Sequence, residues 1–244
     1  MLRVRPLISS LSSAFIVALL SVAAFAVATS VDNNRKPSTE DRVLVQVNVA
    51  ILIQDDLVSR VSTELKITRD FIHSLPEGSQ VMIGYIRSGS LQVRQPFTND
   101  LGKAAGSLRI LVSSSSASPY NPYVEVLEAL KRFDSANKNR NIVLLISDGL
   151  DTSRGFDPGT VLNSIDMERA IGEAKRRDVS IYSFYAPSVG LTSLNSLAAS
   201  YGQSSLNRLS DETGGKAFFQ GRDFVTFTPY FKRLTQALNQ MECD

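Results

Sequence analysis

Apolar and polar positions along this chain follow two kinds of pattern, one typical of strands and one typical of helices, and the two alternate. Residues 43–53 (VLVQVNVAILI) are rich in β-branched side chains and end in a continuously apolar run, which is typical of a central strand covered on both faces. Residues 61–75 carry apolar positions at roughly helical spacing. Two short apolar segments, 81–86 and 91–97, flank turn residues 87–90 and predict a β-hairpin.

The remaining segments continue this alternation. We expect helices over residues 101–111, 122–133, 165–177, 205–213 and 230–241, and strands over residues 141–147, 179–186 and 216–220. Such alternation predicts an α/β fold, namely a doubly wound, mainly parallel six-stranded sheet with one antiparallel edge strand and helices on both faces. Ligands of such sheets bind beyond the carboxyl ends of the strands, so the residues that follow each strand are the first candidates for function.

Residues 1–28 differ from the rest of the chain. Two arginines precede an uncharged apolar run over residues 14–28, which ends in the small-residue pattern Ala-Phe-Ala-Val-Ala. This pattern predicts a signal peptide, with an uncleaved membrane anchor as the alternative. Residues 29–41 are polar and predict a flexible linker, and residues 42–244 form the predicted domain. We therefore expect an exported protein that is periplasmic or secreted, or anchored in the inner membrane by its N-terminal segment.

Composition narrows the classes of function. The chain has 26 Lys and Arg against 24 Asp and Glu, and removal of a leader with Arg3 and Arg5 leaves 24 of each. A neutral domain without a concentrated basic patch argues against a nucleic-acid partner. The single cysteine, Cys243, and the single histidine, His73, exclude zinc clusters of Cys and His. A Ser-His-Asp triad would depend on His73, and the sequence has no phosphate-binding glycine loop, so we expect a non-catalytic protein.

Two of the predicted strands end in acidic turns. Asp55 and Asp56 follow strand 43–53, and Asp148 follows strand 141–147. If these long apolar strands are neighbours, their ends bring Asp55 or Asp56 close to Asp148. Two carboxylates held together raise each other's pKa unless a cation or hydrogen-bond donors compensate, and a hard divalent cation is a natural partner for their oxygens. Taken alone, each aspartate is more simply interpreted as the cap of the following helix.

Three stretches of the chain resemble the von Willebrand factor A domain, in particular its bacterial exported branch. They are residues 51–57 (ILIQDDL), 141–155 (NIVLLISDGLDTSRG) and 206–219 (LNRLSDETGGKAFF). The second stretch is similar to the strand and Ser-Asp-Gly-x-Asp segment of that family and is the most specific of the three. The resemblance covers residues 43–238 and implies a binding module.

The resemblance also implies a metal-ion-dependent adhesion site, in which serine and threonine hydroxyls hold Mg²⁺ and a partner carboxylate completes the shell. On this sequence the site is degenerate. Asp55, Ser59 and Asp148 match metal-ligating positions, but Leu57 stands where the family has a serine, and residues 118–121 contain no threonine. Because leucine offers no ligand atom, the sequence is compatible both with weak Mg²⁺ or Ca²⁺ binding and with a metal-free surface.

We expect a protein partner of unknown identity to contact the loops at residues 55–60, 113–123 and 148–164. The candidate contact residues in these loops are Asp56, Ser118, Tyr120, Asn121, Gly149, Asp151 and Arg154. The two later loops exceed ordinary connection lengths, which favours a functional role. The alternative is a Mg²⁺-dependent, phosphatase-like hydrolase that uses the three strand-end aspartates, although side chains of adjacent residues point in different directions.

Overall fold

The computed structural model describes residues 46–134, 139–156, 164–221 and 225–240. The predicted signal peptide and linker, residues 1–41, lie outside these ranges. No helix within the described ranges is both long and apolar enough to cross a membrane. The described residues belong to one compact unit.

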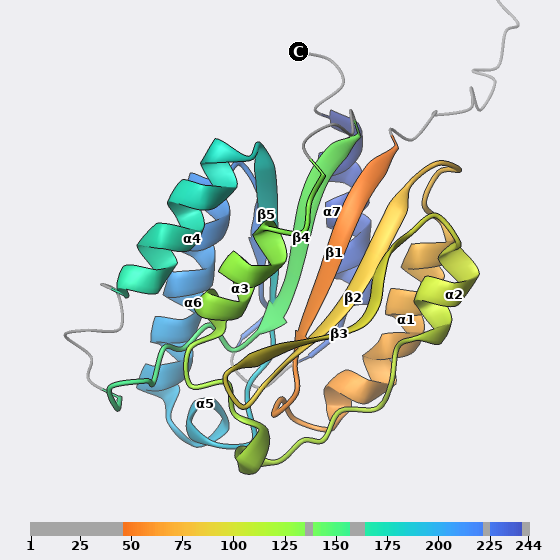
Figure 1. The fold of residues 1–244 in the computed structure, drawn as a ribbon. Coiled ribbons are helices and arrows are strands. Elements are labelled where there is room, and N and C mark those ends of the chain that lie inside the picture. The colour runs from red at the N-terminus through yellow and green to blue at the C-terminus, as the bar shows by residue number, and fades with distance from the viewer. Residues whose placement is uncertain (1–45, 135–138, 157–163, 222–224, 241–244) are drawn as a thin grey trace, which may run out of the picture. The chain divides into compact units, whose positions relative to one another are not determined.

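Six strands form a single sheet in the order β3-β2-β1-β4-β5-β6 (Figure 1). The strands are β1 (Val47–Gln54), β2 (Gln80–Arg87), β3 (Ser90–Thr98), β4 (Arg140–Ser147), β5 (Val179–Tyr185) and β6 (Ala217–Phe218). Every neighbouring pair is parallel except β2 and β3, which form the predicted hairpin at one edge of the sheet. The predicted fold class is therefore confirmed.

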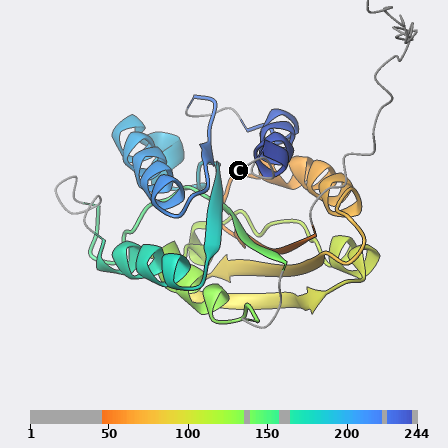
Figure 2. The same ribbon diagram turned by 90° about the horizontal axis from the view of Figure 1, so that it is seen from above.

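Seven α-helices and one 3₁₀ helix connect and cover the strands within the described ranges. The helices are α1 (Arg60–His73), α2 (Leu101–Gly106), the 3₁₀ helix η1 (Ser115–Ala117), α3 (Pro122–Leu130), α4 (Ile165–Arg176), α5 (Leu191–Leu194), α6 (Ser196–Glu212) and α7 (Thr228–Gln240). Helices α1, α2 and α7 pack on one face of the sheet, and α3, α4 and α6 pack on the other (Figure 2). This is the predicted doubly wound arrangement.

Strand β1 shows why the sheet needs a cover on both faces. All eight of its residues are buried. Val49, Ile51 and Ile53 point into the core beneath α1, α2 and α7, whereas Ala50 and Leu52 point into the core beneath α3, α4 and α6. An uninterrupted apolar run therefore specifies a strand in the middle of the sheet.

The short helix α5 is not among the predicted helices, and α3 ends at Leu130 rather than at residue 133. Two other helices differ from the prediction by several residues. Helix α2 ends at Gly106 rather than at residue 111, because the following residues bond to β2 and to the end of β1 instead of forming another helical turn. Helix α6 begins at Ser196 rather than at residue 205. Residues 196–204 carry only two large side chains with apolar surface, those of Leu197 and Tyr201. The helix starts at the side chain of Asn195, which accepts hydrogen bonds from two backbone N–H groups.

Phe184 of β5 is the centre of an aromatic cluster that holds α7 against the sheet. Its ring centroid lies 4.9 Å from that of Phe231, 5.3 Å from Tyr230 and 5.4 Å from Phe227. Phe218 of β6 joins the cluster at 5.6 Å. The last helix and the last strand therefore both pack against the side chain of Phe184 in β5.

Replacement of Phe184 by alanine removes the ring that these four aromatic side chains contact. We expect the free energy of unfolding to fall by about 3–5 kcal/mol, as measured by urea denaturation. Phe219→Ala is the control, because the Phe219 side chain is 40 % exposed and its loss should cost less than about 1 kcal/mol. Equal losses in the two variants would contradict the anchoring role of Phe184.

Candidate functional site

The loops that follow β1, β4 and β5 meet at one end of the sheet, the lower end in Figure 1. Strands β1 and β4 are parallel neighbours, so they end at the same rim. The loops after β1 and β5 are joined by backbone hydrogen bonds. The N–H of Val58 donates to the carbonyl of Pro187 at 3.0 Å, and the N–H of Val189 donates to the carbonyl of Asp56 at 2.9 Å. These bonds give the rim a fixed shape.

A cavity of about 100 Å³ opens at this rim between Asp56 and Asp148. Only 4 % of Asp56 and 5 % of Asp148 is exposed. Gln54 of β1, Ser118 from the loop before α3 and Ser188 from the loop after β5 also line the cavity. Four segments that lie far apart in the sequence therefore bring carboxylate, hydroxyl and amide groups together.

Neutral donors hold both carboxylates in place. The side-chain amide of Gln54 donates to Oδ1 of Asp56 at 2.8 Å. The N–H of Leu150 donates to Oδ1 of Asp148 at 3.2 Å, and the hydroxyl of Thr192 donates to Oδ2 at 3.3 Å. Within the described ranges, no Lys or Arg forms an ion pair with either aspartate. The negative charge of the cavity is therefore not balanced by a described cation of the chain.

Two glycines fix the position of Asp148. Gly149 has a φ of +74°, a conformation that favours glycine. A Cβ atom on Gly202 of α6 would lie 2.0 Å from the carbonyl oxygen of Asp148, so only glycine allows α6 to pack this closely on the end of β4. The hydroxyl of Tyr123 donates to the carbonyl of Gly149 at 2.6 Å and secures the turn from the other side.

Burial and proximity change the acidity of this pair of aspartates. Burial, and after it the charge of Asp148, raises the pKa of Asp56 to about 7. Burial also raises the pKa of Asp148, an effect that its hydrogen bonds only partly offset. Near neutral pH the pair therefore favours a bound proton or another positive charge.

Asp55 has the opposite environment, although it is the neighbour of Asp56 in the sequence. Arg109 donates to both of its carboxylate oxygens, at 2.8 and 2.9 Å, and the N–H of Val112 donates to Oδ1 at 3.0 Å. The guanidinium group of Arg109 also lies 4.0 Å from the ring centroid of Tyr85. Burial alone would raise the pKa of Asp55, but the hydrogen bonds and charge of Arg109 lower it below its ordinary value.

The structure thus separates the two aspartates that the sequence left as alternatives. Asp56 faces Asp148, and Asp55 faces Arg109. The prediction of Asp55 as a metal ligand therefore requires a cation to compete with a two-point ion pair. Ser59, the second predicted ligand, is exposed at the start of α1 and does not line the cavity. Of the three predicted metal-ligating residues, only Asp148 lies at the cavity.

Three of the seven predicted partner-binding residues line the cavity, and the other four lie around it or stabilise its loops. Asp56, Ser118 and Tyr120 line the cavity, and Tyr120 is 59 % exposed. Gly149 lies beneath it, in the turn described above, and Arg154 is exposed in the loop after β4.

Asn121 and Asp151 hold the surrounding loops together. The side-chain oxygen of Asn121 accepts from the N–H of Tyr123 at the start of α3, and its amide donates to Asp166 at 2.8 Å. Asp151 accepts from the hydroxyls of Ser153 and Ser164, each at 2.6 Å. These contacts give both residues a structural role in shaping the rim.

Sequence reasoning missed three residues of the site, namely Gln54, Ser188 and Thr192. Gln54 is the last residue of β1, and its side-chain oxygen accepts from the hydroxyl of Ser147 at 2.5 Å. Ser188 and Thr192 follow β5, which lies beside β4. Finding these two residues requires the strand order, because polar residues that follow a strand reach this rim only when the strand is a parallel neighbour of β4.

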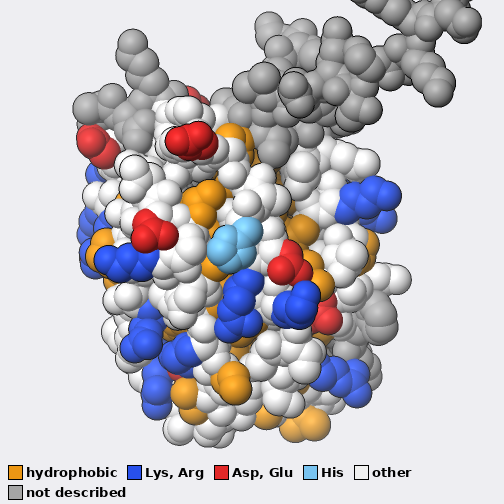
Figure 3. Space-filling view, turned by 90° about the vertical axis from the view of Figure 1, so that its right-hand side faces the viewer, with side chains coloured by type: hydrophobic (Ala, Val, Ile, Leu, Met, Phe, Trp, Pro, Cys, Tyr) orange, Lys and Arg blue, Asp and Glu red, His pale blue; other side chains and the backbone are white. Residues whose placement is uncertain are grey.

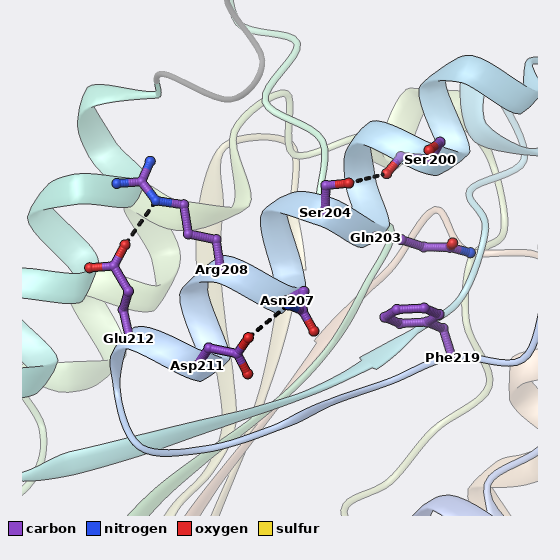
Figure 4. Close-up of a pocket in the computed structure, with 8 residues that line it drawn as sticks. All are labelled: Ser200, Gln203, Ser204, Asn207, Arg208, Asp211, Glu212 and Phe219. Atoms are coloured by element: carbon purple, nitrogen blue, oxygen red, sulfur yellow. Dashed lines mark hydrogen bonds and ion pairs between the residues drawn. The ribbon is translucent and has the colours of Figure 1, made fainter.

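A second concave surface lies along α6 and beside Phe219, with a volume of about 610 Å³ (Figure 4). Its polar side chains bond to one another, to the helix backbone or, for Gln203, to the carbonyl of Gly221. Asn207 donates to Asp211 at 2.7 Å, Ser204 donates to the carbonyl of Ser200 at 2.9 Å, and the Arg208 side chain is likewise paired within the helix. This wide groove therefore offers a ligand fewer free polar groups than the strand-end cavity does.

Other candidate chemistry is sparse in the described part of the chain. His73 is exposed on the last turn of α1 (Figure 3), away from the strand-end aspartates in the fold. No group of three or more His, Cys, Asp or Glu side chains that could hold a metal ion occurs among the described residues. The strand-end cavity, with two carboxylates surrounded by neutral polar groups, is the candidate functional site.

Comparisons with known proteins agree on the fold. No family model matches the chain, and no curated protein matches it. Among solved structures, an aerotolerance-related membrane protein from Bacteroides fragilis superposes with a TM-score of 0.52 at 13% identity, covering 81% of this chain and 100% of that one. BatB from Bacteroides thetaiotaomicron also gives 0.52 at 13%, covering 82% and 100%. A von Willebrand factor type A protein from Catenulispora acidiphila gives 0.50 at 16%, covering 80% of this chain and 42% of that one.

The chain has the von Willebrand factor A fold. This finding confirms the fold that the three sequence stretches suggested. At identities of 13% to 16%, the likeness shows the fold alone, and the function depends on the residues of this chain.

Removal of the Arg109 side chain leaves the carboxylate of Asp55 buried without its main partner. We expect Arg109→Met to lower the free energy of unfolding by about 3 kcal/mol at pH 7. Because the pKa of Asp55 is lowered in the folded domain, this contribution is present at neutral pH and disappears as the pH falls below about 4.

Urea denaturation at pH 7 and at pH 2 measures the loss for Arg109→Met. Arg87→Met is the matched control, because its guanidinium lies 3.8 Å from Asp55 and its side chain is 38 % exposed, so it should cost much less. An equal or larger loss in the control would refute the assignment of Arg109 as the main partner of Asp55.

The raised pKa of Asp56 predicts the opposite effect at the cavity. Folding favours the protonated form of Asp56, so its contribution to stability is present below about pH 4 and is lost as the pH rises towards 7. Asp56→Asn removes this penalty, and we expect it to raise the free energy of unfolding by about 1–3 kcal/mol at pH 8 and by little at pH 4. Thermal or urea denaturation at both pH values measures the difference, and Asp55→Asn, which breaks the Arg109 pair, should be destabilising at pH 8.

Proposed function

We propose that this von Willebrand factor A domain is an exported, non-catalytic protein-binding module. It engages a partner protein through the loops at the carboxyl ends of its strands, with or without a divalent cation such as Mg²⁺ or Ca²⁺. Support for export comes from the sequence of residues 1–28, which has the charge and apolar pattern of a signal peptide or anchor.

The observation that carries this proposal is a group of exposed apolar residues on two segments that also line the strand-end cavity. Nine large apolar residues are exposed within the described ranges, and six of them lie between α2 and α3 or between the end of β5 and the first turn of α6. We call these six residues the apolar rim: Ile110, Val112, Tyr120, Val189, Leu194 and Leu197. Clustered exposed apolar groups around a polar centre are typical of a protein interface.

A hydrolase that uses the strand-end aspartates is less well supported. Both oxygens of Asp55 are occupied by Arg109, so this carboxylate is not available as a nucleophile. Asp56 and Asp148 are nearly buried and accept hydrogen bonds that fix them in place. The exposed apolar surface is what a binding module needs and what a phosphatase site does not explain.

The rim can be tested with one double variant and one control variant. Tyr120→Ser with Leu194→Ser alters the rim, and Phe219→Ser alters an apolar residue after β6 that is 40 % exposed and does not line the cavity. The full chain and both variants are immobilised and used to capture proteins from the extracytoplasmic fraction of the source organism.

We expect a protein that the unaltered chain retains to be retained equally by the control variant and at least about tenfold less by the rim variant, since loss of two anchors costs more than about 1.4 kcal/mol. Circular dichroism of each variant checks that it is folded. Equal capture by the rim variant would place the interface elsewhere and refute the proposal.

A further inference from the structure

We propose that the strand-end cavity receives the side-chain ammonium group of a lysine that the partner protein presents. This inference rests on the proposed function, since it names the chemistry by which the partner is recognised. It follows from the charge, the size and the surroundings of the cavity.

The charge of the cavity calls for a cation from outside the described chain. Asp56 and Asp148 are each at least 95 % buried, and their described hydrogen-bond donors are neutral groups from Gln54, Leu150 and Thr192. The neighbouring Asp55 differs, because the guanidinium of Arg109 binds both of its oxygens and neutralises its charge. A buried charge without a partner is costly, so a ligand that brings a positive charge gains the interaction that the chain leaves unmade.

The size of the cavity suits an ammonium group. A volume of about 100 Å³ corresponds to about three water molecules. An ammonium group is compact and has three donors that can point in different directions, whereas the guanidinium of arginine is a planar fork suited to one carboxylate. Acceptors surround the cavity on several sides, namely the carboxylates of Asp56 and Asp148 and the hydroxyls of Ser118 and Ser188.

The apolar rim completes the match to lysine. A lysine carries an apolar four-carbon stem behind its charged end. Tyr120 and Leu191 line the mouth of the cavity, and the exposed side chains of Val189 and Leu194 lie in the same loop region. The fitting ligand is therefore a lysine flanked by apolar residues in an exposed segment of the partner.

A displayed library of random linear dodecapeptides, selected on the full chain in buffer with EDTA, tests this inference without knowledge of the partner. We expect the selected peptides to share one lysine flanked by apolar residues. In synthetic copies, Lys→Gln should weaken binding by at least about thirtyfold, the effect of removing one side of a desolvated charge pair, and Lys→Arg should also weaken it.

Variants of the domain identify which part of the inference holds. Asp56→Asn should weaken the same peptides by at least about thirtyfold. Asp178→Asn, a change of equal charge on the exposed turn before β5 and therefore at the opposite end of the sheet, should have little effect. A double variant of the rim, Tyr120→Ser with Leu194→Ser, reports on the proposed binding face itself.

Four outcomes overturn the lysine inference. Selection of peptides that lack a basic residue but still depend on the rim would support the proposed binding face and refute the lysine inference. A parallel selection with Mg²⁺ or Ca²⁺ in place of EDTA that yields acidic peptides, while the selection with EDTA yields no lysine peptide, would show that a metal occupies the cavity instead. Selection of no peptide would refute the lysine inference. Selection of peptides whose binding changes in neither the Asp56 variant nor the rim variant would refute it as well, and would also count against the proposed function.

Discussion

The parallel pairing of β1 with β4 is the interaction on which the rest of this domain depends. It places two long strands with continuously apolar middle segments at the centre of the sheet, and helices on both faces then bury them. Because parallel neighbours end at the same rim, the pairing also brings the acidic turn after each strand to one place. The same contacts that build the core therefore create the candidate site, and the position of the site is a consequence of the fold.

At that rim, two successive aspartates have opposite roles because successive side chains at the end of an extended strand point in opposite directions. Asp55 is directed towards Arg109, which neutralises it and ties the segment after α2 to the end of β1. Asp56 is directed towards Asp148 and raises the local negative charge. One carboxylate thus stabilises the structure, and the other stores an unfavourable interaction that a ligand can relieve.

The strands, their hairpin and the neighbouring positions of the acidic turns could be predicted from the sequence, because each depends on local periodicity or on the order of apolar runs. The choice between Asp55 and Asp56 could not, since it depends on Arg109, which is 54 positions along the chain and stands in a segment predicted as helix. The contributions of Ser188 and Thr192 depend on the place of β5 beside β4. Strand order of this kind is set by tertiary packing rather than by any local pattern.

Leu57 is where the sequence departs from the family pattern, and this departure affects the electric charge of the cavity. The resemblance places a metal-ligating serine at this position, but here the side chain is fully buried in the core and the backbone forms a bridge with Ser188. Leucine therefore strengthens the contact between two rim loops at the expense of a ligand oxygen. The carboxylates of Asp56 and Asp148 give the cavity negative charge, and this is the charge that the proposed lysine of the partner would meet.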